Sequence, residues 1–203
     1  MKNKKTVLAA IALVVVMVIG SMAAYLTSVT GNVTNTMTVG DVDITLDETK
    51  VNEYGEEIPN EDPVTENTYK LLPNHTYMKD PEIHVLEGSE PCYVFVKVTN
   101  EIAAIEAAGD TTIAKQMETK GWLPLDGKEG VFYKADPVDA RQDQVDVRVF
   151  DSFKIDGAKS NEEIAAFEGN TIVIKGYAIQ ADGFANAVAA SAGLNFDETP
   201  VEP

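Results

Sequence analysis

The sequence predicts a mainly β domain built as a two-sheet sandwich with short helices in the connections. Three observations indicate this fold. Apolar and polar residues alternate in short runs along the chain, turn-forming Gly, Pro, Asn and Asp residues separate the runs, and the stretches with helical periodicity are brief. About seven such strands with small helical insertions suit two packed sheets. The length of 203 residues is enough for one domain with a substantial core.

The clearest strand covers residues 91–100, and we expect it at the centre of the core. Its side chains divide between two faces, with Cys92, Val94, Val96 and Val98 on one and Tyr93, Phe95, Lys97 and Thr99 on the other. A second short strand is predicted at 81–86. The residues between them include Gly88, which is typical of a turn, so we expect the two strands to form a hairpin.

Other strands are predicted where the same alternation recurs, at 39–47, 122–125, 131–134, 145–149 and 171–181. Short helices are expected at 101–108, at 112–120, after the capping box that starts at Ser160, and at 184–191 with Asp182 as its cap. The tail 195–203 is acidic and ends in proline, which predicts a flexible end.

Residues 1–23 have the pattern of a secretory signal peptide. Three lysines precede the uncharged apolar run 7–20, and small residues follow it. We expect cleavage between Ala23 and Ala24, because Ser21 and Ala23 are the small residues that a signal peptidase recognises. The alternative is an uncleaved membrane anchor, although the run is shorter than the span of about 20 residues that a bilayer requires.

The chain is strongly acidic, and its charge excludes some partners. Removing 1–23 would move the net charge from −17 to about −20. Such a surface repels nucleic acid and anionic lipid, so we expect no nucleic-acid partner and membrane contact only through an uncleaved signal. The single cysteine, Cys92, has no internal partner and is interpreted as a small buried apolar residue.

Residues 24–38 are predicted to be an N-terminal donor strand, followed by the sandwich domain at 39–194. The segment has no charged side chain and is rich in strand-forming residues. A terminal strand of this kind can add to the sheet of another copy, where main-chain hydrogen bonds supply affinity. The side chains expected to contact the acceptor are Tyr25, Leu26, Val29, Val33 and Met37.

Five stretches together resemble the TasA/camelysin family of exported Gram-positive proteins, which a dedicated signal peptidase processes. They are 20–25 (GSMAAY), 38–44 (TVGDVDI), 72–81 (LPNHTYMKDP), 92–98 (CYVFVKV) and 176–184 (GYAIQADGF). The resemblance implies a jelly-roll type of sandwich. For the TasA branch it also implies fibres of the biofilm extracellular matrix, in which each subunit donates its N-terminal strand to the next. The implied partners are other copies of the chain or related matrix subunits, and the implied location is the cell surface or matrix.

No pattern of catalytic residues was found. The chain has two histidines, His75 and His84, but lacks the His-Glu-x-x-His motif, a Gly-x-Ser-x-Gly motif and a Gly-rich phosphate loop. We therefore expect no cofactor, metal or catalytic site. Two sites remain as alternatives: a calcium site in the acidic segment 47–66, although it lacks EF-hand spacing, and a camelysin-like metallopeptidase centre using the histidines.

Three functions follow as hypotheses. The first is a secreted structural protein that assembles into fibres by N-terminal strand donation. The second is a cell-surface metallopeptidase, which predicts chelator-sensitive casein cleavage that is lost on His75→Ala or His84→Ala. The third is a monomeric surface binding module, which predicts neither assembly nor cleavage.

Overall fold

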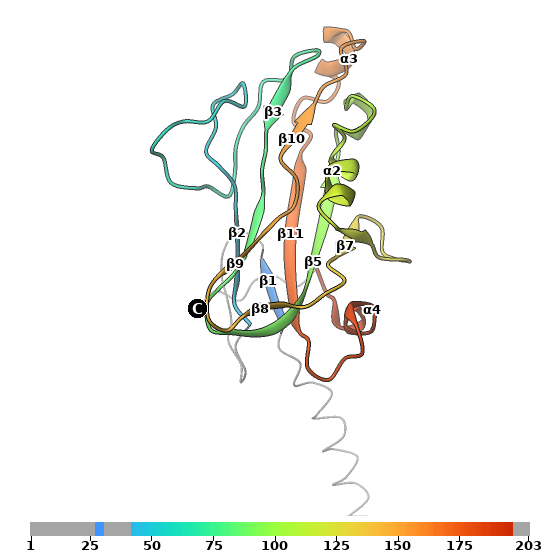
Figure 1. Cartoon of the computed structure of the whole chain (residues 1–203). Coiled ribbons are helices and arrows are strands. Elements are labelled where there is room, and N and C mark those ends of the chain that lie inside the picture. Colours follow the sequence, from blue (N-terminus) through green and yellow to red (C-terminus); the bar gives the residue numbers. More distant parts are fainter. Residues whose placement is uncertain (1–26, 31–41, 197–203) are drawn as a thin grey trace, which may run out of the picture.

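The structure is a computed structural model that describes residues 27–30 and 42–196. Within this part the chain is mainly β, with antiparallel sheets and a few short helices, so the predicted fold class is confirmed (Figure 1). The predicted signal peptide, with its cleavage site at Ala23 and Ala24, lies outside the described residues.

The first layer is a six-stranded antiparallel sheet in the order β1-β11-β5-β7-β6, with β8 also paired to β5. Its long central pair is β5 and β11, which run side by side from the pair Asn100–Ile172 to the pair Cys92–Gln180. Its strands are β1 (Thr27–Thr30), β5 (Ser89–Asn100), β6 (Leu123–Pro124), β7 (Val131–Tyr133), β8 (Val138–Ala140) and β11 (Ile172–Gln180).

The second layer combines a three-stranded sheet, in the order β2-β4-β9, with the two-stranded sheet β10-β3. Its strands are β2 (Ile44–Asp47), β3 (Thr76–Met78), β4 (Glu82–Val85), β9 (Val145–Arg148) and β10 (Ser152–Lys154). Backbone bonds join the two parts: the Val149 N–H donates to the Pro81 carbonyl at 2.9 Å, and the Lys79 N–H donates to the Asp151 carbonyl at 3.3 Å. The two small sheets therefore form one continuous layer.

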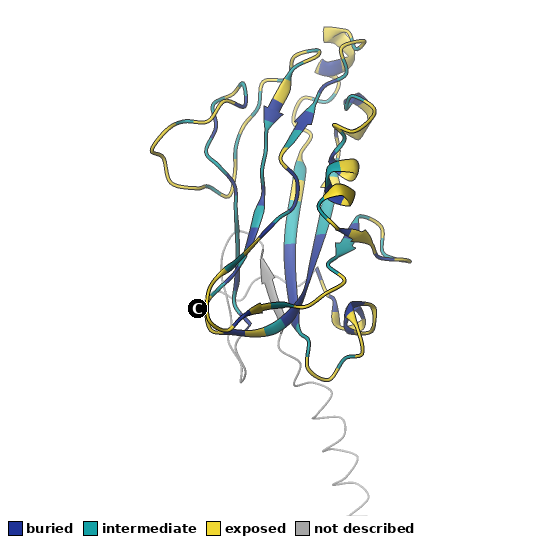
Figure 2. Ribbon diagram, in the orientation of Figure 1, coloured by how far each residue is buried: buried dark blue, intermediate teal, exposed yellow. Residues whose placement is uncertain are grey.

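The main hydrophobic core lies between the two layers. One face of β5, with Cys92, Val94 and Val96, packs there against residues of the second layer such as Ile83 and Val85. The opposite face of β5 is also buried, because its aromatic residues pack in a second cluster with Tyr177, Ile179 and the segment 187–196. Residues 92–96 of β5 are all buried, and part of the strand is dark blue in Figure 2, as expected for a central strand.

The predicted hairpin between 81–86 and 91–100 is wrong. β4 pairs with β2 and β9 in the second layer, whereas β5 pairs with β11, β7 and β8 in the first. The residues that connect β4 to β5 cross from one layer to the other. They bond to distant segments, and no ladder of hydrogen bonds joins β4 to β5. The Leu86 N–H donates to the Asp43 carbonyl at 2.9 Å, and the Gly88 N–H donates to the Ala140 carbonyl at 2.9 Å.

The helices are short, as predicted, but several bounds differ: they are η1 (Ala103–Ile105), α2 (Ile113–Thr119), α3 (Asn161–Ala165), α4 (Ala187–Ala190) and η2 (Ser191–Gly193). The Ser160 capping box is confirmed. The cap of α4 is Asn186 and not Asp182, because the Asn186 side chain accepts a bond from the Ala189 N–H at 2.9 Å. Phe196 is 7% exposed and packs on Tyr177, so the packed domain continues into the start of the predicted tail.

Cys92 is fully buried on the inner face of β5, and burial raises the pKa of its thiol to about 12. We therefore predict that the native chain resists a thiol reagent such as dithionitrobenzoate at pH 8, because the reactive thiolate is scarce and inaccessible. Unfolding in guanidinium should release one reactive thiol per chain. Rapid labelling of the native chain would contradict this assignment.

Candidate functional site

The outer edge of β11 is the part of the sheet that bears most directly on the strand donation predicted from the sequence. Strand β1 pairs with this edge in antiparallel register, from Thr27 opposite Ile179 to Thr30 opposite Gly176. The pairing therefore covers only the C-terminal half of β11. Within the described residues, no strand pairs with 172–175 on the side away from β5.

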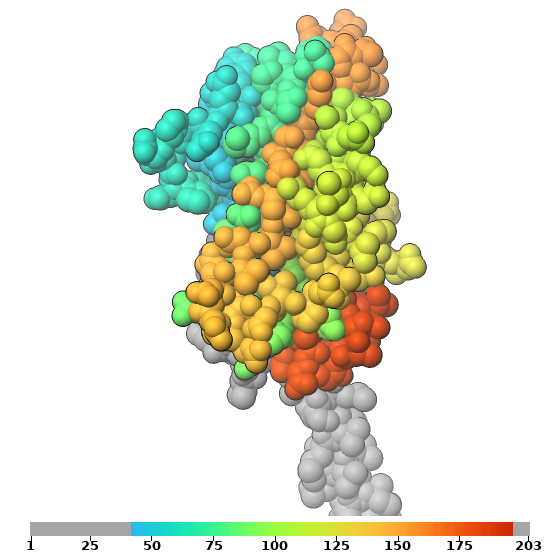
Figure 3. Space-filling view, in the orientation of Figure 1, coloured from blue at the N-terminus to red at the C-terminus, as the bar shows by residue number. Residues whose placement is uncertain are grey.

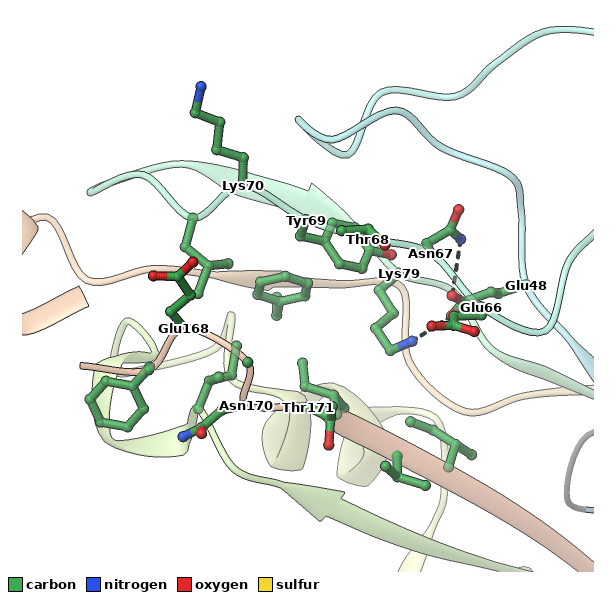
Figure 4. Close-up of a pocket in the computed structure, with 18 of the residues that line it drawn as sticks. Glu48, Glu66, Asn67, Thr68, Tyr69, Lys70, Lys79, Glu168, Asn170 and Thr171 are labelled. Carbon is green, nitrogen blue, oxygen red and sulfur yellow. Dashed lines mark hydrogen bonds and ion pairs between the residues drawn. The ribbon is translucent and has the colours of Figure 1, made fainter. Parts of the chain in front are cut away.

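A groove of about 900 Å³, called here the inter-layer groove, opens beside this uncovered half of β11. Residues 167–174 form one of its walls, and residues 64–72 form the wall on the second layer (Figure 4). Ile172 and Ile174 on the first wall, and Tyr69 and Leu71 on the second, also pack against the main core. The groove is thus a place where the core of the sandwich reaches the surface.

The wall at 64–72 is held in place by two tyrosines. The Tyr77 hydroxyl donates to the Lys70 carbonyl at 2.6 Å and accepts from the Leu72 N–H at 2.7 Å. The Tyr69 hydroxyl donates to the Met78 carbonyl at 3.0 Å. Tyr69 and Tyr77 also meet edge to face, with ring centroids 5.7 Å apart. These contacts make the wall a preformed part of the fold.

The groove also has a polar region around Glu48. This buried carboxylate pairs with the Lys79 ammonium at 2.6 Å and accepts a bond from the Asn67 amide at 2.9 Å, as the dashed lines in Figure 4 mark. The groove therefore offers apolar surface together with polar side chains that already have partners.

Only one of the predicted donor residues falls in the described part of the chain. Val29 belongs to β1 and lies opposite Tyr177 of β11. Tyr25, Leu26, Val33 and Met37 lie outside the described residues. The structure thus places part of the predicted donor segment on a sheet edge, and that edge belongs to its own chain.

The two histidines are not brought to a common site. His75 Nε2 lies 2.8 Å from the Tyr54 carbonyl, and its ring contacts Tyr77. His84 instead lies on the second layer, with Nδ1 2.7 Å from Asp146 Oδ1 and Nε2 3.1 Å from Asp47 Oδ1. The described contacts therefore do not form the two-histidine centre that the metallopeptidase alternative requires.

His84 belongs to a polar cluster that the sequence analysis did not identify. Glu82, His84 and Asp146 each offer a ligand atom, and these atoms lie within 4.8 Å of one another. Partial burial lowers the pKa of His84, but the bonds and charges of Asp146 and Asp47 outweigh this effect and leave it above its usual value. The sequence feature that could have pointed to this cluster is the spacing of Glu82 and His84, because residues two apart in a strand lie on one face.

The acidic segment 47–66 contributes none of these three ligand atoms, although its first residue, Asp47, contacts His84 Nε2. Within the described residues, no three side chains of this segment form such a group, so the proposed calcium ligands are not brought together. The segment projects from the body of the molecule (Figure 3) but is partly structured. Isolated bridges join Glu48 to Val64 and Val51 to Glu57.

Comparison with protein-family models, with curated proteins and with solved structures finds no match for this chain. Among the described residues, no helix has the length and apolar character needed to cross a bilayer.

Proposed function

We propose that this chain is an exported structural protein that assembles into fibres of the cell surface or extracellular matrix by donating its N-terminal strand to a neighbouring copy. The observation that carries the proposal is the half-covered edge of β11, where β1 occupies 176–179 and no other strand in the described part of the chain pairs with 172–175 on that side. In an assembled state, β1 of one copy would take the same edge on the next copy. The resemblance of the sequence motifs to the TasA/camelysin family also supports it.

The register of β1 indicates how a donated strand would extend. Continuing the pairing that places Thr30 opposite Gly176 would put Val33 opposite Val173. Residues directly opposite in an antiparallel pair share a face, and Val173 is 42% exposed. Extension of the donor would thus bury an exposed valine against another valine.

The same register assigns the donor side chains to faces. Tyr25, Val29, Val33 and Met37 are spaced by four residues, so they share the face on which Tyr177 lies. Asn32 and Thr34 would face the inter-layer groove, opposite Ile174 and Ile172. Short polar side chains suit a groove that combines apolar walls with the Glu48 and Lys79 pair.

Strand exchange of this kind forms open chains of subunits. Each copy donates a strand from one place and accepts a strand at another, so the interface is head-to-tail. A head-to-tail interface yields a filament when its rotation does not close a ring. Exchange replaces backbone bonds that the monomer already makes, and the extra pairs along 172–175 favour the assembled state.

Truncation of the donor tests the proposal. A chain that starts at Ala24 is expected to form fibres visible by negative-stain microscopy, whereas a chain that starts at Val39 should stay monomeric because it lacks the donated strand. Circular dichroism of the Val39 chain provides the check that the sandwich remains folded. Equal assembly of both chains would remove the strand-donation mechanism.

A synthetic peptide provides the matched control. The peptide 24–38 should bind the Val39 chain, because the β11 edge is then vacant, and a scrambled peptide of the same composition should not. Absence of binding together with absence of assembly by the Ala24 chain would favour the monomeric binding module.

A further inference from the structure

The outer face of the second layer carries a polar cluster that has no part in the proposed strand exchange. In the cross-strand register, His84 of β4 lies opposite Asp146 of β9, and Glu82 of β4 lies opposite Asp47 of β2. A hollow of about 330 Å³ lies alongside, and its lining includes Asp47, Glu82 and His84. Three strands thus bring one imidazole and three carboxylates to one side of the sheet.

We propose that Glu82, His84 and Asp146 bind one divalent cation of the zinc class. The three residues each present a ligand atom, and all of these atoms lie within 4.8 Å of one another. Two atoms bound at about 2.1 Å to a tetrahedral Zn²⁺ lie roughly 3.4 Å apart. Closing the cluster onto a cation therefore needs side-chain shifts of about 1 Å, without a change in the sheet.

Asp47 holds the imidazole in the orientation that coordination requires. His84 Nε2 lies 3.1 Å from Asp47 Oδ1, while Nδ1 is directed at Asp146 Oδ1, 2.7 Å away. When Nε2–H donates to Asp47, Nδ1 is left to bind the cation. A carboxylate behind a histidine ligand is the usual arrangement at zinc sites, where it fixes the tautomer. Coordination of Nδ1 replaces its proton, which leaves to solvent.

The neighbours of the cluster position its carboxylates. Arg148 contacts both oxygens of Glu82, at 3.1 and 3.2 Å, and also pairs with Asp80. The Gln144 amide donates to Asp146 Oδ1 at 2.7 Å. Each carboxylate retains a lone pair for a cation, and the bond between His84 Nδ1 and Asp146 Oδ1 is released when Nδ1 loses its proton. The single guanidinium does not neutralise the surrounding carboxylates, so the site attracts positive charge.

The types of ligand atom determine which cations the site prefers. An imidazole nitrogen suits Zn²⁺ and its neighbours in the transition series, whereas Ca²⁺ and Mg²⁺ require oxygen ligands. His84 is only 16% exposed, so a bound cation would be partly shielded from water. A preference for zinc over calcium therefore distinguishes this site from the general attraction of cations to an acidic protein.

Calorimetric titration of the full chain with ZnCl₂ tests the proposal. We expect saturable binding of one ion per chain that a large excess of CaCl₂ does not displace. His84→Gln and Asp146→Asn should each weaken zinc binding at least a hundredfold, because each removes a ligand. Asp47→Ala should weaken it by about 10- to 100-fold, because it removes the carboxylate that orients the histidine ligand.

Two control variants match these changes. His75→Gln removes the other histidine, and Asp139→Asn removes an exposed carboxylate whose partner is Arg141. Both should bind zinc like the parent chain. Since the chain has two histidines, the proton NMR signals of the two rings provide a second readout that needs no variant to fold. Zinc should shift the His84 ring signals and leave those of His75 in place.

Several results would overturn the proposal. They are unsaturable binding, full displacement by calcium, undiminished affinity in His84→Gln, or a zinc-induced shift confined to the His75 ring. None of these results depends on whether fibres form, so the cation site can fail while strand donation stands.

Discussion

Proline at position 28 or 29 of the peptide 24–38 is expected to weaken its binding to the chain that starts at Val39 at one position and to leave binding unchanged at the other. Both residues lie in β1, where Ser28 pairs with Ala178 and Val29 with Tyr177. Successive N–H groups of a strand point in opposite directions, so only one of the two donates to β11. Proline has no N–H, and at the donating position it removes a ladder bond and leaves a carbonyl of β11 unpaired.

The expected size follows from the energy of such a bond. Leaving a buried acceptor unpaired costs about 1–3 kcal/mol, and each 1.4 kcal/mol changes a binding constant by about tenfold. The sensitive proline peptide should therefore bind the Val39 chain roughly 5- to 140-fold more weakly than the parent peptide, as measured by calorimetric titration.

Alanine variants provide the matched controls for this pair. Peptides with Ser28→Ala or Val29→Ala retain the N–H groups, so both should bind. If both proline peptides bind like the parent peptide, β1 does not form the contact through its backbone. The alternating result would also show which N–H groups of β1 bond to β11 in the complex.

The strands were predictable from sequence because burial leaves a period-two pattern. Residues 92–96 alternate between two apolar sets, and the structure places these sets in two separate cores. The same holds for β11, where Ala178 packs in the main core and Tyr177 and Ile179 pack in the second. The alternation of neighbouring residues determines the face of the sheet on which each side chain lies. This alternation can be read from a single sequence.

Strand partners were less predictable, because they depend on distant segments. The residues around Gly88 do form a turn, because the Ser89 N–H donates to the Leu86 carbonyl at 3.1 Å. The N–H groups of Leu86 and Gly88, however, bond to the distant residues Asp43 and Ala140. A connection between layers and a hairpin can use the same local residues. The difference lies in which sheet each flanking strand joins, and local spacing does not encode that choice.

The composition of the candidate sites was hard to predict for the same reason, because it depends on which strands pair. Glu82 and His84 share a strand face, but Asp146 reaches them only because β9 pairs with β4. The inter-layer groove depends on 64–72, which overlaps the end of the acidic segment 47–66. Tyr77 holds the wall at 64–72 through hydrogen bonds to the backbone of Lys70 and Leu72. The predicted donor segment was visible in sequence, whereas the half-covered edge of β11 was not.

Tyr77→Ala is expected to destabilise the domain by about 3–5 kcal/mol, the range for removing a large buried aromatic side chain. Tyr77 is fully buried, stacks on Phe153 with ring centroids 4.9 Å apart, and bonds to Lys70 and Leu72 through its hydroxyl. Urea unfolding followed by the fluorescence of the single tryptophan, Trp122, measures the loss, because this side chain is 1% exposed in the native chain.

Tyr77→Phe separates the hydroxyl from the ring and tests its role in the groove. It keeps the stacking but leaves the Leu72 N–H and the Lys70 carbonyl without their partner, which should cost about 1–3 kcal/mol. Tyr133→Phe is the matched control, because the contact recorded for Tyr133 is through its ring, with Phe95. Since the Tyr77 hydroxyl holds the wall at 70–72, Tyr77→Phe should also slow fibre growth. Stability within about 0.5 kcal/mol of the parent chain would mean that water replaces the hydroxyl and that the wall does not depend on it.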